Sequence, residues 1–214
     1  MMSGFQVPNA VQLRVSIDRI EPQIWRRLIV PSSYNLRDLH LVLQAALGWT
    51  NAHLHEFEIG GLRFGDSDIA NAENGPEDAR AFDEMDVRLR DFTREPGTTF
   101  TYVYDMGDNW VHTVCLEKHV ALDPAPKVAL CVEGARARPP EDVGGPSGYQ
   151  EFLEAFLDPT HEEHRQMMRW AGGRFDPEWC DLGLINKDVA RALHANLKRR
   201  AHQPRRGAVA ERGK

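Results

Sequence analysis

Six carboxylate and imidazole side chains are the residues of this sequence best suited to chemistry. They are His55, Asp105, Asp108, His112, Glu141 and Asp142. Carboxylates and imidazoles bind divalent cations and transfer protons, so a group of them drawn from neighbouring strand ends would suit a metal-assisted hydrolase. The alternative is structural: turn aspartates that bond their own loop backbone, and core histidines satisfied by hydrogen bonds. Spacing alone does not bring these groups within reach of one another, so both interpretations stay open.

Two further polar motifs do not predict a site. His161 and His164 are three residues apart in an expected first helical turn, whereas the zinc-protease signature needs histidines four apart. The glycine-rich segment 144–148 precedes an expected helix but lacks the Lys-Ser/Thr pair of a phosphate-binding loop. We therefore assign no metal ligand and predict no cofactor.

Alternating apolar and β-branched residues predict the strands that would position the candidate groups. These strands cover residues 11–17, 24–30, 53–59, 100–104 and 110–118, with a short one near 87–89. Leucines at helical spacing predict a helix over 36–47, with Asn35 as its N-cap and Gly48 just past its end. The turn-rich segment 105–109, which holds two of the candidate aspartates, would connect a hairpin.

Helical patterns follow in the second half of the chain. They cover residues 149–157, the segment from Thr160 to near Gly172, and a last helix capped by Asn186. The order ββαβ…ββ followed by helices predicts an α+β fold: a mixed or mainly antiparallel sheet, helices packed on it and a helical C-terminal half. The order of the elements is also similar to that of a β-grasp fold, so a β-grasp-like arrangement is one form that the sheet could take. We expect a single domain over 1–197, sheet-rich over 10–120 and helix-rich over 147–197.

Charge is distributed unevenly along the chain. Residues 198–214 contain seven Lys or Arg and one Glu, while the whole chain has a net charge of −6, which leaves −12 on residues 1–197. A basic tail of this kind suits DNA or another polyanion. Its candidate contacts are Lys198, Arg199, Arg200, Arg205 and Arg206. The alternative is a solvated, disordered terminus without a partner.

A second charged segment, residues 66–95, contains ten acidic and four basic residues. Its weak periodicity predicts a long surface excursion, and its charge makes an acidic protein–protein interaction module a further hypothesis. The remaining composition excludes several classes. No apolar run reaches the roughly 20 residues of a membrane-spanning helix, and the N-terminus has no signal-peptide pattern. Three scattered cysteines fit a reducing compartment, so we expect a cytoplasmic protein without a membrane partner.

Four motifs together resemble one known family. They are IWRRLIVP at 24–31, LGWTNAHLHEFEIGG at 47–61, YVYDMGDNWVH at 102–112 and CVEGARARPPEDVGGPSGYQEFL at 131–153. In this order they are similar to the plasmid pRiA4b ORF-3-like family over about residues 10–185. The resemblance implies an α+β bacterial protein of plasmids, mobile elements or chromosomes, often labelled TnpR-like or resolvase. It leads us to expect an accessory protein that acts by binding.

The resolvase label can be tested on the residues. Ser16 lies in a segment, Arg14 to Asp18, that resembles the nucleophile strand of serine recombinases, but no arginine-bearing helix or helix-turn-helix follows. Tyr149, the last tyrosine, has no Arg-His-Arg set around it. We therefore expect a protein that is not a recombinase.

The resemblance also bears on metal binding. Related sequences commonly carry cysteines in the pattern C-x6-C-x4-C, where this chain has Cys131, Arg138 and Val143. One thiolate seldom holds a structural zinc ion, so a thiolate site is not expected here. Cys131 then acts as a small buried apolar residue.

Overall fold

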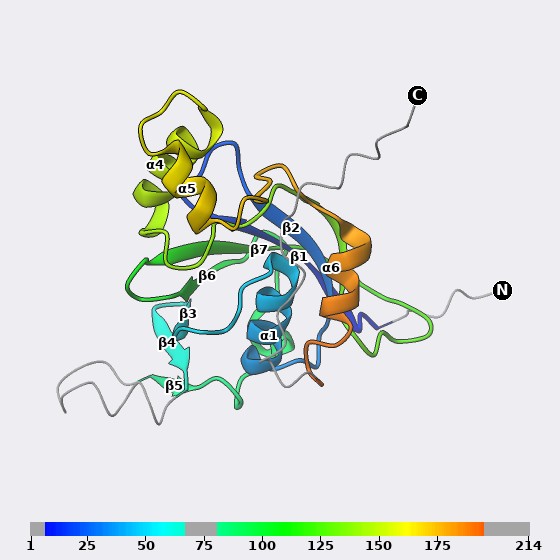
Figure 1. The fold of residues 1–214 in the computed structure, drawn as a ribbon. Coiled ribbons are helices and arrows are strands. Elements are labelled where there is room, and N and C mark those ends of the chain that lie inside the picture. Colours follow the sequence, from blue (N-terminus) through cyan, green and yellow to red (C-terminus); the bar gives the residue numbers. More distant parts are fainter. Residues whose placement is uncertain (1–6, 67–80, 195–214) are drawn as a thin grey trace, which may run out of the picture.

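The computed structural model describes residues 7–66 and 81–194, and within them it contains one eight-stranded sheet and five helices (Figure 1). The strands are β1 (Ala10–Ile17), β2 (Trp25–Pro31), β3 (His55–Ile59), β4 (Leu62–Gly65), β5 (Phe82–Asp83), β6 (Thr99–Tyr104), β7 (Trp110–Val120) and β8 (Leu130–Ala135). The helices are α1 (Leu36–Leu47), α3 (Leu89–Phe92), α4 (Gly145–Leu157), α5 (His164–Trp170) and α6 (Leu182–Val189). The basic tail 198–214 and residues 67–80 of the acidic segment lie outside the described residues.

The sheet has the strand order β5-β4-β3-β6-β7-β1-β2-β8. Every neighbouring pair is antiparallel except β4 and β5, which run parallel, so the sheet is mixed and the predicted α+β class is confirmed. The long strands β1 and β7 pair at its centre, where Ile17 lies opposite His112. The pairing of β3 with β6, where His55 lies opposite Tyr104, brings the hairpin loop between β6 and β7 beside the loop that leads into β3.

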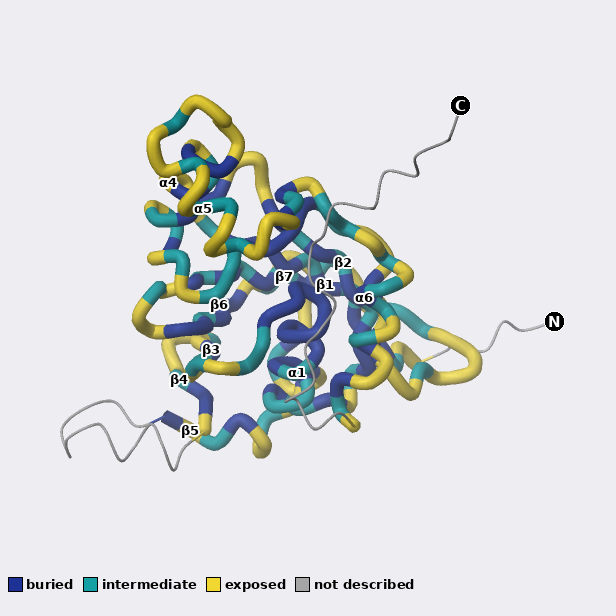
Figure 2. Tube along the Cα trace, in the orientation of Figure 1, coloured by how far each residue is buried: buried dark blue, intermediate teal, exposed yellow. Residues whose placement is uncertain are grey.

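Helices α1 and α6 cover one face of the sheet, as Figure 1 shows, whereas α4 and α5 pack together at one end of the molecule. Alternation in β1 produces the buried face: Val11, Leu13 and Val15 are fully buried under α1. Figure 2 shows the buried segments gathered where α1 meets the central strands. The opposite face of the sheet carries charged side chains, and there Arg27 pairs with Glu117 at 2.7 Å.

Helix α1 matches its sequence prediction. It spans Leu36–Leu47, the Asn35 side chain accepts a hydrogen bond from the Asp38 backbone N–H at 2.8 Å, and Gly48 ends it with φ of 92°. The strand expected from residue 53 begins at His55 instead, so His53 lies in the preceding loop. Leucine periodicity and caps define a helix sharply, whereas alternation alone does not mark where strand pairing starts.

Other elements differ from the predictions. The segment near 87–89, expected as a strand, leads into the short helix α3. Helix α6 begins at Leu182 with Asp181 as its cap, whereas the Asn186 side chain bonds the backbone of Cys131. Strands β4, β5 and β8 were not expected, and β8 precedes the three helices α4, α5 and α6 of the second half. In the described ranges, no helix is long and apolar enough to cross a membrane.

Candidate functional site

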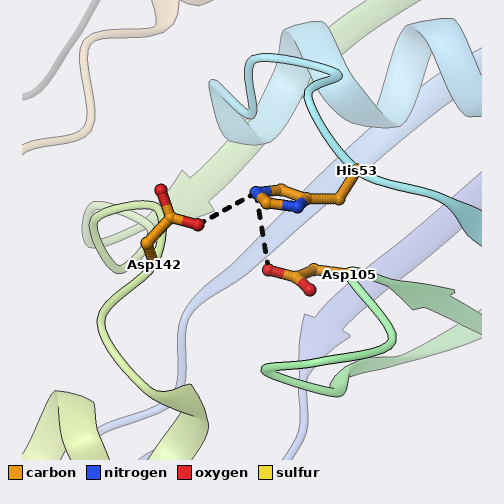
Figure 3. Close-up of side chains that lie close together, drawn as sticks. All are labelled: His53, Asp105 and Asp142. Carbon is orange, nitrogen blue, oxygen red and sulfur yellow. Dashed lines mark ion pairs between the residues drawn. The ribbon is translucent and has the colours of Figure 1, made fainter.

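Three loops converge at one end of the sheet. His53 comes from the segment between α1 and β3, Asp105 from the loop between β6 and β7, and Asp142 from the loop that precedes α4. Figure 3 shows the two aspartates on either side of the His53 ring edge. One ligand atom from each of the three side chains lies within 4.8 Å of the other two. A third carboxylate, that of Glu141, joins them through its Oε2 atom.

The Nε2 atom of His53 is the centre of this group. It lies 3.2 Å from Asp142 Oδ1, 3.6 Å from Asp105 Oδ2 and 3.9 Å from Glu141 Oε2. The Nε2 atom is buried, yet it makes no hydrogen bond with any residue that the structure describes. All three distances permit ion pairing, but the contact with Asp142 lacks the alignment that a hydrogen bond requires, and the other two are too long for one. Glu141 Oε2 is buried and unpaired in the same way.

Each anchored carboxylate uses one oxygen for support and turns the other toward His53. Asp105 Oδ1 accepts the backbone N–H groups of Gly107 at 3.0 Å and Asp108 at 3.2 Å. Glu141 Oε1 accepts both the backbone N–H and the hydroxyl of Thr50, each at 2.8 Å. Outer hydrogen bonds of this kind orient the ligands of metal sites.

The backbone at both aspartates adopts the left-handed conformation, with φ of 58° at Asp105 and at Asp142. Aspartate tolerates this region better than most residues, because its short polar side chain can bond locally. In the hairpin loop the local bonds are the two N–H groups that Asp105 accepts. The hydrogen bonds that close the hairpin loop therefore also orient the second carboxylate oxygen of Asp105 toward His53.

Aromatic and cationic side chains close the inner wall of the group. The Trp49 and Tyr104 rings lie 5.1 Å apart, and the Arg138 guanidinium lies 5.0 Å from the Trp49 ring. Arg138 is buried and donates to the Gly48 carbonyl at 2.9 Å, and burial lowers its guanidinium pKa although the charge of Glu141 opposes that shift. Burial also raises the pKa of the Tyr104 hydroxyl, which donates a long bond of 3.5 Å to Glu141.

Of the six candidate residues, Asp105, Glu141 and Asp142 lie in this group and the other three lie elsewhere. Asp108 is in the same hairpin loop, but its Oδ2 accepts the Gly144 backbone N–H at 3.0 Å and joins the hairpin to the start of α4. His55 Nε2 pairs with Glu84 at 2.7 Å, and its ring stacks on His40 at 3.4 Å between centroids.

His112 lies fully buried in the core behind the group. Its Nε2 accepts the Trp49 Nε1–H at 3.2 Å, and its Nδ1 lies 3.1 Å from the Tyr102 carbonyl, which makes Nδ1 the protonated nitrogen. Burial lowers the pKa of His112 to about 4. The ring is therefore a neutral packing element near neutral pH.

Of the two histidines in the polar segment His53-x-His55, sequence reasoning selects His55 and passes over His53. Its only signal was the spacing His53-x-His55 beside a glycine- and asparagine-containing turn, and the strand predicted from residue 53 assigned both histidines to one face. Because β3 starts two residues later, His53 turns toward the hairpin loop whereas His55 turns into the core.

This chain is similar to known proteins over most of its length. The model of the plasmid pRiA4b ORF-3-like proteins matches residues 9–183. The chain belongs to the plasmid pRiA4b ORF-3-like family. Among curated family relatives, the uncharacterized protein y4hQ of Sinorhizobium fredii is 41% identical over 187 residues, which cover 86% of this chain and 92% of that protein.

A solved structure supports the same assignment. The protein of unknown function MM3350 from Methanosarcina mazei Go1 is 37% identical, with a TM-score of 0.70 over 84% of this chain and 97% of that one. Neither description mentions a mobile element or a resolvase, so that association stays a prediction. The match to the plasmid pRiA4b ORF-3-like family establishes the family and the fold.

In this family member, the residues considered as recombinase nucleophiles and as zinc ligands are buried in the fold. Ser16 is 8% exposed in the central strand β1, and Tyr149 is 1% exposed in α4. Where the resemblance implies cysteines in relatives, Arg138 is buried against Trp49. Cys131 is buried in β8, and burial raises the pKa of its thiol to about 11.

Proposed function

We propose that this chain binds one divalent metal ion between His53, Asp105 and Asp142 and acts as a metal-assisted hydrolase. The observation that carries the proposal is the His53 Nε2 atom, which is buried without an aligned hydrogen bond and is faced by three carboxylate oxygens within 4 Å. A buried polar atom without a partner is costly, and an ion at this point would satisfy it.

Two of the three donor spacings are close to those around a small ion. Ligands about 2.1 Å from a metal ion stand roughly 3.0–3.5 Å apart in tetrahedral or octahedral arrangements. The distances from His53 Nε2 to Asp142 and Asp105, 3.2 and 3.6 Å, are close to that range. One imidazole with carboxylates suits Mn²⁺, Fe²⁺ or Zn²⁺.

Glu141 suits the role of general base. Its Oε1 is held by Thr50, which leaves the buried Oε2 free to take a proton beside the three ligands. Three protein ligands leave coordination positions for substrate and water, and the ion would supply polarisation of a substrate oxygen and a lowered pKa for water. The side chains thus divide into three that hold the ion and one that moves a proton.

The test is calorimetric titration of chelator-treated full-length protein with Mn²⁺ and Zn²⁺. We expect one ion per chain, and at least tenfold weaker binding for His53→Gln and Asp105→Asn. Asp108→Asn is the matched control, because Asp108 lies in the same hairpin loop but outside the group, and an amide oxygen at this position can still accept the Gly144 backbone N–H. Equal binding by the wild type and His53→Gln would overturn the metal site.

Hydrolysis is tested separately with Glu141→Gln. We expect this variant to keep metal binding within about tenfold and to lose at least a hundredfold in turnover of p-nitrophenyl esters, bis(p-nitrophenyl) phosphate or amino-acyl p-nitroanilides. Absence of turnover by the metal-loaded wild type on all three probe classes would remove hydrolysis and leave a metal-binding protein.

A second candidate function, binding of DNA or another polyanion, rests on the charge of the sequence. Seven basic residues and one acidic residue lie within 198–214. This segment is outside the described residues, so its case depends on the counterion-release argument alone. The two functions use different parts of the chain and are tested independently.

A further inference from the structure

A cavity of about 390 Å³ opens beside the proposed metal site, between the loop that precedes α4 and the helices α4 and α5. Asp142 belongs both to the His53 group and to the lining of this cavity. The volume lies within the range of small-molecule sites in proteins. A ligand in the cavity would therefore reach the ion through the Asp142 side.

Apolar side chains form a large part of the cavity wall. Phe152 from α4 and Met167 and Trp170 from α5 line it, and the Phe152 and Trp170 rings meet edge to face with centroids 5.6 Å apart. Phe152 is 2% exposed, whereas Trp170, at the end of α5, is 48% exposed. A large aromatic ring left open at a cavity is a surface that an organic ligand can cover.

The charge of the cavity has one sign. Asp142, Glu151 and Glu163 line it, and none of its described lining residues is Lys or Arg. The side chains of Glu151 and Glu163 form no hydrogen bond or ion pair with residues in 7–66 or 81–194. The first turn of α4 contributes about +0.5 charge from its dipole, which is small against three carboxylates. The cavity therefore favours cations.

We propose that this cavity binds an organic ammonium ion, with Glu151 and Glu163 as its counter-charges and Trp170 and Phe152 against its apolar part. An inorganic ion would gain nothing from the aromatic and thioether wall, whereas an ammonium carried on an apolar body uses both carboxylates and rings. Asp142 is left to the metal ion, so the ammonium is held by the other two carboxylates.

Ammonium binding rests on the cavity walls alone, whereas its meaning as substrate recognition rests on the proposed function. If the chain is the proposed hydrolase, its substrates carry an ammonium group close to the bond that is cleaved. Anionic substrates such as phosphodiesters would be repelled by the same carboxylates.

Three matched compounds test the proposal by calorimetry on the full chain: 2-phenylethylammonium, 2-phenylethanol and phenylacetate. We expect the ammonium to bind at least tenfold more tightly than the alcohol, and phenylacetate not to bind. Glu151→Gln/Glu163→Gln should weaken ammonium binding at least tenfold, and Trp170→Ala should weaken the binding of both the ammonium and the alcohol. Equal affinity for the ammonium and the alcohol, or no binding of the ammonium, would overturn the proposal.

The control is Glu154→Gln/Glu162→Gln, which removes two exposed carboxylates from α4 and from the turn before α5, with the same change in net charge and outside the cavity lining. It should bind the ammonium like the wild type, and a loss equal to that of Glu151→Gln/Glu163→Gln would mean that only overall charge matters.

His53→Gln separates this proposal from the metal site. It should lose Mn²⁺ but keep 2-phenylethylammonium within about threefold. If Glu151→Gln/Glu163→Gln instead lost Mn²⁺ tenfold and left ammonium binding unchanged, the cavity carboxylates would belong to the metal site, and the ammonium proposal would fail.

Discussion

At the scale of single residues, the candidate site depends on which oxygen of each carboxylate is already occupied. Asp105 and Glu141 each have one oxygen saturated by N–H or hydroxyl donors and the other aimed at His53. Residue type and turn context were enough to nominate both carboxylates from the sequence. His53 stands in the same polar segment as His55 but could not be chosen over it, because the direction of each side chain depends on the residue at which β3 starts pairing.

The Thr50 hydroxyl gives the first prediction at this scale. Both this hydroxyl and the Thr50 backbone N–H donate to Glu141 Oε1. Thr50→Val therefore removes the hydroxyl bond and keeps the backbone bond. Outer-sphere partners of metal sites are worth about 10–100-fold in affinity or activity. We expect hydrolytic turnover of the Mn²⁺-loaded protein to fall about tenfold with Mn²⁺ affinity changed less, measured by steady-state kinetics and calorimetry. Unchanged turnover would show that Glu141 does not need this support.

His112 gives a prediction about pH. Its pKa is lowered by burial to about 4 from an ordinary 6.5, so the unfolded chain binds more protons between these values. Its contribution to stability is therefore complete above pH 6.5 and is lost as the pH falls toward 4, by up to about 3 kcal/mol. Protonation would also point an N–H of the ring at the Trp49 N–H. Buried His40, whose pKa is also lowered by burial, acts in the same direction.

The measurement is urea unfolding at pH 7.5 and pH 5. The loss of unfolding free energy between the two should be smaller in His112→Gln than in the wild type by about 2 kcal/mol. His119→Gln, which removes an exposed histidine from the same strand, is the control and should leave the difference unchanged.

At the scale of elements, the sequence predicts those parts that carry their own periodicity. Helix α1 has apolar spacing, a cap and a terminating glycine, and its bounds follow from these residues. Strands β4, β5 and β8 lack such signals: β5 has two residues, and β8 exposes Leu130 and Val132 at the sheet edge, so its apolar residues do not mark a buried face. Their pairing is decided by tertiary contacts that local patterns do not encode.

The junction between the hairpin loop and α4 gives a prediction at this scale. Gly145 has φ of 70°, and a Cβ there would lie 2.5 Å from the Asp108 carbonyl oxygen. Gly172 has almost the same φ, 69°, but open space around it. Gly172→Ala should therefore cost only the backbone strain, about 1 kcal/mol, whereas Gly145→Ala should cost at least about 2 kcal/mol more.

Urea unfolding of both variants measures this difference. In Gly145→Ala the loop that precedes α4 has to move away from the hairpin loop, and this loop carries Asp142. Gly145→Ala should therefore also weaken Mn²⁺ binding, which Gly172→Ala should not do. Equal stability of the two variants would mean that the hairpin and α4 are not held in close contact.

At the scale of the whole molecule, two opposite charges are separated along the chain. The tail 198–214 carries +6 and the rest of the chain −12. The acidic part contains the proposed metal site and the proposed ammonium cavity, both of which are suited to cations, and it should repel a phosphate backbone. Any affinity for DNA must therefore come from the tail.

Salt dependence of DNA binding tests this separation. If the five clustered tail residues neutralise five phosphates of duplex DNA, the slope of log K against log salt concentration is about −4.5, so affinity falls roughly 500-fold between 50 and 200 mM salt. Those residues are Lys198, Arg199, Arg200, Arg205 and Arg206. A chain that ends at Leu197 should lose both the affinity and the slope, as measured by fluorescence anisotropy, while Mn²⁺ binding stays unchanged because the metal ligands lie elsewhere. Persistent binding of the truncated chain would locate a nucleic-acid surface on the acidic part, where only a metal ion bridging to phosphate could support it, and a chelator would then abolish the binding.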